Sequence, residues 1–239
     1  MSKKALYRAF IQYIKILFKD AMLVLLCVAP IISGLFFRYG IPFIQALLTK
    51  YLDLPGFLQP YYLLFDLLLG SLTPVLYCFA ASYVILGEID DGISKYLAVT
   101  PVGKSGYLIS RLGIPAFIAF AISILTLCIF RLTRLSFMDI IAISFVGALL
   151  GVSIALIVVA LSGNKVEGMA VSKLAGLAFL GLPAPFFIKG GEQYALFFLP
   201  SFWMARFSLQ HNYFALITGV FISVLWIFIL YRSFRKKIR

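Results

Sequence analysis

Long apolar runs recur along this chain, and only short polar stretches separate them. Six runs are evident, at residues 21–37, 61–86, 106–130, 139–161, 170–188 and 212–231. An α-helix rises about 1.5 Å per residue, so about 20 apolar residues cross the roughly 30 Å hydrocarbon core of a bilayer. Hydrophobic residues fill 63% of the 239 positions and charged residues 13%, too little polar material to cover a water-soluble globule of this size. The sequence therefore predicts an all-α membrane protein with six transmembrane helices in one domain, residues 1–239.

The basic residues are distributed unevenly around these six runs. Of the 21 Lys and Arg residues, those on the side opposite the two termini are Arg38, Lys50, Arg131, Arg134, Lys189 and Arg206. The others lie at the termini and in the loops on the same side, and enrichment in Lys and Arg marks cytoplasmic segments. We therefore expect both termini in the cytoplasm. The net charge of +12 suits a lipid bilayer surface rather than nucleic acid, because no soluble basic module is present.

Two segments outside the long runs have a different character. Residues 3–19 place apolar side chains on one helical face and basic ones on the other, which predicts an amphipathic helix at the inner membrane interface or, alternatively, a basic extension of the first span. Prolines and glycines interrupt residues 183–211, where we expect broken, partly re-entrant helices. The aromatic residues Phe197, Phe198 and Trp203 there suit either an interfacial anchor or part of a substrate path.

Asp66 is the one acidic residue well inside a predicted span. An ionisable group is costly at that depth, so it needs either a partner or a function. Arg131 and Arg134 are close enough to the same membrane boundary to form an ion pair with it. The alternatives for Asp66 are therefore structural pairing, or substrate contact and proton coupling.

The sequence lacks the residue constellations of an enzyme. No HExxH motif is present, and the only histidine is His211. Gly103, Lys104 and Ser105 resemble the end of a phosphate-binding loop, but Ala98 stands where the first glycine of that loop belongs, and no buried strand precedes it. We expect no catalytic site, no metal site and no cofactor bound by this chain.

Small residues recur every four positions in two places. The first stripe is Gly147, Gly151 and Ala155, and the second is Gly168, Ser172 and Gly176. Such stripes let helices approach closely in membranes. They could serve either a dimer interface or packing within one subunit.

The loop over residues 87–105 combines charged and apolar residues in a helical pattern. One face of the pattern holds Ile89, Ile93, Tyr96 and Leu97. Pro101 opposes continuation of a helix. The pattern predicts a short amphipathic helix at the cytoplasmic surface, either an ordinary connector or a docking element.

This loop resembles the first cytoplasmic loop of the permease subunits of type-2 ABC exporters. That loop carries a Glu, a following Gly, an apolar stretch and a Thr-Pro pair, and the matching residues here are Glu88, Gly92, Leu97, Thr100 and Pro101. The later segment 164–169 is similar to the corresponding loop of small bacterial members. The resemblance covers nearly the whole chain.

The resemblance implies that residues 88–98 form a coupling helix that docks on a separate ABC ATP-binding subunit, with a second contact at 163–169. The residues implied to contact that partner are Glu88, Asp90, Asp91, Gly92, Tyr96, Leu97, Thr100, Pro101, Lys165, Glu167 and Gly168. ATP and Mg would bind in the partner. Two ATP-binding chains and a second permease, either another copy or a paralogue, would complete the transporter in a bacterial cell membrane.

Related small permeases imply cargo of three kinds: antibiotics, bacteriocin-like peptides, and amphipathic peptide toxins such as phenol-soluble modulins. The aromatic, apolar composition suits an amphipathic or hydrophobic substrate. The substrate path would include Asp66, Phe197, Phe198 and Trp203. The alternative function is an ion-coupled secondary transporter in which Asp66 is the coupling carboxylate, although no inverted repeat is apparent.

Overall fold

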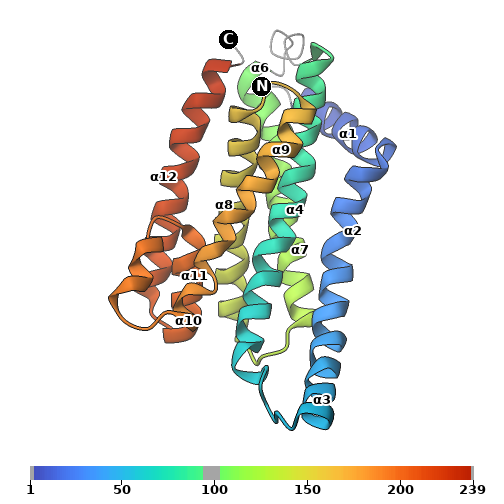
Figure 1. Cartoon of the computed structure of the whole chain (residues 1–239). Helices are drawn as coiled ribbons and strands as arrows, with labels where there is room; N and C mark the ends of the chain where they lie inside the picture. Colours follow the sequence, from blue (N-terminus) through green and yellow to red (C-terminus); the bar gives the residue numbers. More distant parts are fainter. Residues whose placement is uncertain (1–2, 94–102, 238–239) are drawn as a thin grey trace.

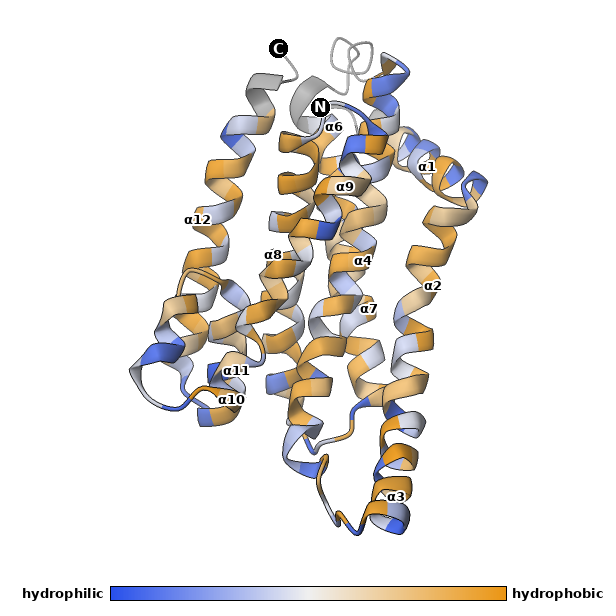
Figure 2. Cartoon of the chain, viewed as in Figure 1, coloured by the Kyte–Doolittle hydropathy of each residue, from blue (hydrophilic) through white to orange (hydrophobic). Residues whose placement is uncertain are grey.

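The computed structural model describes residues 3–93 and 103–237, and within these ranges the chain forms helices and loops without strands. Five helices are long and apolar enough to cross a membrane, and they are Ala21–Leu52, Gln59–Asp90, Gly106–Phe130, Phe137–Leu161 and Tyr213–Phe234. They run side by side as one bundle (Figure 1). Apolar residues predominate along most of the length of these helices (Figure 2). The prediction of a multi-pass, all-α membrane protein is confirmed.

The helix bounds follow the predicted runs closely at most positions. The long elements are α2 (Ala21–Leu35), α3 (Ile41–Leu52), α4 (Tyr62–Asp90), α7 (Ile114–Phe130), α8 (Phe137–Leu161) and α12 (Tyr213–Lys237). A short 3-10 turn, Gln59–Tyr61, precedes α4. The short helix α6 (Gly103–Leu108) precedes α7, and the π-helical turn η3 (Ile109–Gly113) joins the two.

The first long helix, Ala21–Leu52, extends further than the first predicted span. We expected the first span to end at residue 37, but a π-helical turn, Phe36–Gly40, leads directly into α3. Pro42 has no backbone N–H to give to the Arg38 carbonyl, and the ladder widens by one residue instead of breaking, with Ile41 N bonded to Phe36 O. The helix therefore continues about 18 Å beyond Gly40, since α3 has 12 residues.

The centre of the bundle is the contact between α4 and α8. A Cβ atom added at Gly147 would lie 2.6 Å from the Gly70 carbonyl oxygen, and one at Gly151 would lie 2.9 Å from that of Pro74. Only glycine permits this approach of the two backbones. The stripe that begins at Gly147 therefore packs within the subunit, which resolves the alternative that the sequence left open.

The expected continuous span over 170–188 is replaced by a series of short helices. They are α9 (Lys165–Ala175), η4 (Gly176–Gly181), α10 (Ala184–Phe187), η5 (Gly191–Leu196) and α11 (Pro200–Gln210). Glycines and Pro183 interrupt the regular ladder. The broken character predicted for 183–211 is confirmed, and the break begins earlier than predicted. The segment starts beside the end of α8 and brings the chain toward the start of α12 (Figure 1).

The N-terminal helix α1 (Lys3–Lys19) lies across one end of the bundle, beside the start of α2 and the last turns of α4 (Figure 1). We call this the α1 end, and the opposite one the α3 end. Tyr13 and Leu17 are buried in the core, whereas Phe18 is 69% exposed. The predicted helix over 3–19 is present, and part of its apolar face packs on the bundle rather than facing lipid.

Candidate functional site

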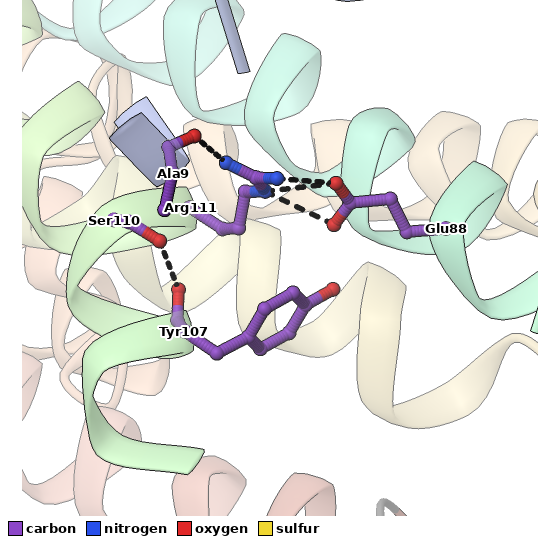
Figure 3. Close-up of polar contacts among 5 residues, drawn as sticks. All are labelled: Ala9, Glu88, Tyr107, Ser110 and Arg111. Atoms are coloured by element: carbon purple, nitrogen blue, oxygen red, sulfur yellow. Dashed lines mark hydrogen bonds and ion pairs between the residues drawn. The ribbon is translucent and has the colours of Figure 1, made fainter. Parts of the chain in front are cut away.

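A buried ion pair joins three elements at the α1 end. The Arg111 side chain is 0% exposed and that of Glu88 is 2% exposed. Arg111 Nε lies 3.0 Å from each Glu88 carboxylate oxygen, and Nη2 lies 2.5 Å from Oε1. Arg111 Nη1 donates to the carbonyl of Ala9 in α1 (Figure 3). One guanidinium therefore ties α1, α4 and η3 together.

Local sequence explains where both charges stand. Glu88 is in the last turn of α4, and Arg111 is in η3, where Ile114 N bonds to Ile109 O. Pro115 cannot donate to the Arg111 carbonyl, which accounts for the widened turn at this position. The pair thus lies where a long, rigid helix meets a turn with an irregular backbone.

Both side chains of the pair are buried, so each charge depends on the other. Burial of an ion costs several kcal/mol, and the remaining member of a broken buried pair is an uncompensated charge. The Tyr107 ring lies beside the pair, with its centroid 5.9 Å from the guanidinium carbon (Figure 3). Its hydroxyl makes no hydrogen bond within the described residues. The contact therefore links three elements through one buried charge pair.

A second polar group at the same end involves Lys165, the first residue of α9. Its backbone N donates to Asp90 Oδ2 at 2.9 Å, and its Nζ lies 2.6 Å from Asp20 Oδ2. Asp20 caps α2 by accepting from Met22 N. The hydrogen bond from Lys165 holds the pKa of Asp20 below its ordinary value. Together these contacts join α2, α4 and α9.

The predicted coupling residues divide into three sets. Glu88 is turned inward to Arg111, because α4 continues to Asp90 instead of ending at the predicted loop boundary, residue 87. Asp90 and Asp91 are exposed at the end of α4, and Gly92 follows with a φ of +70°. The others in this loop, Tyr96, Leu97, Thr100 and Pro101, lie outside the described residues.

The predicted second contact forms the start of α9. Glu167 accepts a hydrogen bond from Gly163 N, and its own N donates to the Asn164 side chain at 2.8 Å. Gly168 is buried against α4. Lys165 and Glu167 therefore order the turn between α8 and α9, immediately beside the end of α4.

Arg111 was missed as a site residue by the sequence reasoning, which counted it only as a loop charge. A signal was available, since Arg111 lies inside the predicted span 106–130. A basic residue within a span needs an acidic partner, for the same reason that Asp66 needs a partner.

Asp66 is fixed by hydrogen bonds at the α3 end. It is 1% exposed and accepts from Leu132 N at 2.7 Å, from Thr133 N at 2.8 Å and from Thr133 Oγ1 at 2.5 Å. The expected ion pair with Arg131 or Arg134 is not formed within the described residues. Backbone N–H groups of the loop donate to the carboxylate instead. These hydrogen bonds hold the loop between α7 and α8 against α4.

Of the three predicted aromatic residues, Phe198 lines an apolar pocket of about 440 Å³, whereas Phe197 and Trp203 are not among its lining residues. Its walls come from α8, α9, η4, α12 and the segment before α11, and they include Phe198 and Trp226. Trp226 Nε1 donates to the Phe198 carbonyl at 3.0 Å, and Trp203 Nε1 donates to that of Phe197 at 2.6 Å. The volume and apolar walls suit a drug-sized molecule.

The fold and these polar contacts define a multi-pass membrane permease whose helices are tied together at one end. The chain belongs to the family described as fluoroquinolones export permease protein Rv2686c-like, whose model matches residues 13–231. Two curated relatives from Mycobacterium tuberculosis strains, CDC 1551 / Oshkosh and ATCC 25618 / H37Rv, are named fluoroquinolones export permease proteins. Each is 28% identical over 233 residues, covering 92% of this chain and 90% of the relative. No solved structure gives a significant match.

Proposed function

We propose that this chain is the membrane subunit of an ATP-driven exporter and is coupled to a separate ATP-binding subunit. The observation that carries the proposal is the buried Glu88–Arg111 pair at the base of the loop after α4. A force applied to that loop reaches α4 directly, and the pair passes it to α1 and η3. The network around Lys165 passes it to α2 and α9.

The central helix can carry such a displacement through the bundle. α4 has 29 residues and packs closely on α8. A partner that binds one position of the loop more tightly than another shifts the equilibrium between two arrangements of these helices. Closure of the ATP-binding subunits on ATP would supply that difference.

The membrane arrangement that we propose has six crossings, with the interrupted segment from α9 to α11 making the fifth. Both termini, the loop after α4 and the start of α9 then lie on the cytoplasmic side. Two permease chains and two ATP-binding chains form the working transporter in the bacterial cell membrane, and ATP and Mg bind only to the latter.

The proposed substrate is an amphipathic drug of the fluoroquinolone kind. The names of the relatives support this class over a peptide toxin or a bacteriocin, and the apolar pocket between α8, α9 and α12 supports a hydrophobic molecule of similar size. Phe198 and Trp226 offer aromatic surface for a flat ring system.

The coupling is tested by two matched glycine substitutions. Gly92 has a φ of +70°, whereas Gly87 lies within α4, and a Cβ atom would meet no atom within 4 Å at either position. Gly92→Ala should therefore destabilise the observed backbone conformation at residue 92 by about 1–2 kcal/mol. Gly87→Ala should not, because residue 87 is helical. We expect only Gly92→Ala to lower drug-stimulated ATP hydrolysis in proteoliposomes that contain both subunits. Equal activity of the two variants would contradict the docking of this loop.

A further inference from the structure

A polar pocket of about 380 Å³ opens at the α3 end, far from the Glu88–Arg111 pair. Three arginines line it: Arg38 from the π-helical turn before α3, and Arg131 and Arg134 from the loop between α7 and α8. We call it the arginine pocket. No carboxylate lines it within the described residues.

The protein does not fully balance the charges of the arginine pocket. Arg38 Nη1 donates to the Arg131 carbonyl at 2.7 Å, and Arg131 Nη1 donates to that of Leu135 at 2.5 Å. None of the three arginines forms an ion pair within the described part of the chain. Asp66 lies behind the loop, and even if its single negative charge is set against the three positive ones, a net charge of about +2 remains.

Hydrogen bonds within the protein hold the backbone of the arginine pocket. The Asp66 carboxylate holds the backbone of Leu132 and Thr133, the two residues that follow Arg131. The bond from Arg38 to the Arg131 carbonyl joins this loop to the first long helix. A site whose backbone is already ordered loses less entropy on binding. Asp66 thus helps to hold the loop that carries Arg131 and Arg134.

The depth of the arginine pocket matches a membrane surface. α7 ends at Phe130 and α8 begins at Phe137, so the loop that carries two of the arginines marks the boundary of these spans. Ile129 is 63% exposed and lines the pocket, and Phe137 is 62% exposed on the first turn of α8. Exposed apolar side chains therefore lie next to the guanidinium groups. A phospholipid has the matching arrangement, with acyl chains next to a charged headgroup.

We propose that the arginine pocket binds a phosphate group, that of an anionic phospholipid in the leaflet at the α3 end. Guanidinium groups present two parallel N–H donors that match phosphate oxygens. The lipid would join the first long helix to the loop between α7 and α8.

The test measures binding of phosphatidylglycerol and phosphatidylcholine to the purified full chain in detergent by native mass spectrometry. Arg134→Gln and Arg38→Gln remove a pocket charge each. Lys50→Gln, on exposed α3 at the same end, removes an equal charge outside the pocket. Thermal unfolding of every variant verifies that it is folded.

We expect phosphatidylglycerol to bind at least tenfold more tightly than phosphatidylcholine, and each pocket variant to lose about tenfold of that affinity. Lys50→Gln should bind as the wild type does. Inorganic phosphate that displaces the lipid at equal concentration would assign the site to soluble phosphate, whereas poor displacement assigns it to a headgroup. Equal binding of the two lipids, or an equal loss in Lys50→Gln, would overturn the proposal.

Discussion

At the scale of single residues, two buried carboxylates are stabilised by different kinds of partner. Glu88 is paired with a guanidinium, whereas Asp66 accepts hydrogen bonds from a loop backbone and a threonine hydroxyl. The first arrangement joins separate helices through a charge, and the second fixes one loop. A change at Glu88 should therefore affect the positions of whole elements.

Glu88→Gln is expected to lower the free energy of unfolding by about 3–5 kcal/mol, because it leaves the Arg111 charge buried without a partner. The measurement is thermal or denaturant unfolding of the purified chain in detergent. Asp91→Asn removes an exposed carboxylate one turn further on and should have little effect. Replacement of both partners by Leu and Met should restore most of the stability, since an apolar pair can substitute for a buried ion pair. An unchanged stability of Glu88→Gln would contradict the described pair.

At the scale of elements, the two π-helical turns have the same sequence pattern. Each turn ends within the sequence Arg-x-Gly-Ile-Pro, which begins at Arg38 in one case and at Arg111 in the other, and the Ile and Pro begin the next helix. In both, the proline removes the donor for the arginine carbonyl, and the helix continues after a widened turn. In both, the arginine side chain reaches a carbonyl of another element, Arg131 or Ala9.

The long helices and α1 could be predicted because apolar length and helical period are local properties of the sequence. The span 106–130 ends where predicted, whereas the predicted span 21–37 was too short, because the helix continues through a π-helical turn into α3. The site was harder to predict. Glu88 and Arg111 are 23 positions apart, and the partners of Asp66 are mostly backbone groups that composition does not reveal.

The contact between α4 and α8 gives a direct prediction. Gly147→Ala should destabilise the chain by about 1–3 kcal/mol, because its Cβ would lie 2.6 Å from the Gly70 carbonyl oxygen and force the helices apart. Gly176→Ala is the matched control, since its Cβ would meet no atom within 4 Å. Unfolding in detergent measures both. Equal stability of the two variants would contradict the close approach of α4 and α8.

The contact between α2 and α9 predicts a dependence on pH. Because Lys165 lowers the pKa of Asp20 in the folded chain, the contact stabilises the fold above the ordinary Asp value of 3.8 and is lost as pH falls through the lower, folded value. Asp20→Asn should therefore cost up to about 1 kcal/mol at pH 7, and less as the pH falls below 3.8. Lys165→Gln should cause a similar loss at pH 7. A constant difference between wild type and Asp20→Asn across this range would refute the assignment.

At the scale of the whole molecule, the polar ties lie at the α1 end and the arginine pocket at the α3 end, with apolar helices between them (Figure 2). This distribution suits a subunit that receives a force at one surface and changes the packing of its helices along their length. The proposed account assigns ATP hydrolysis to a second protein.

The most direct test of this account is drug transport into inside-out vesicles that contain the chain with or without its ATP-binding subunit. We predict ATP-dependent uptake of a fluoroquinolone only when both subunits are present, and a strong loss of that uptake in Gly92→Ala but not in Gly87→Ala. Uptake by the chain alone, driven by an ion gradient and indifferent to ATP, would contradict the central claim.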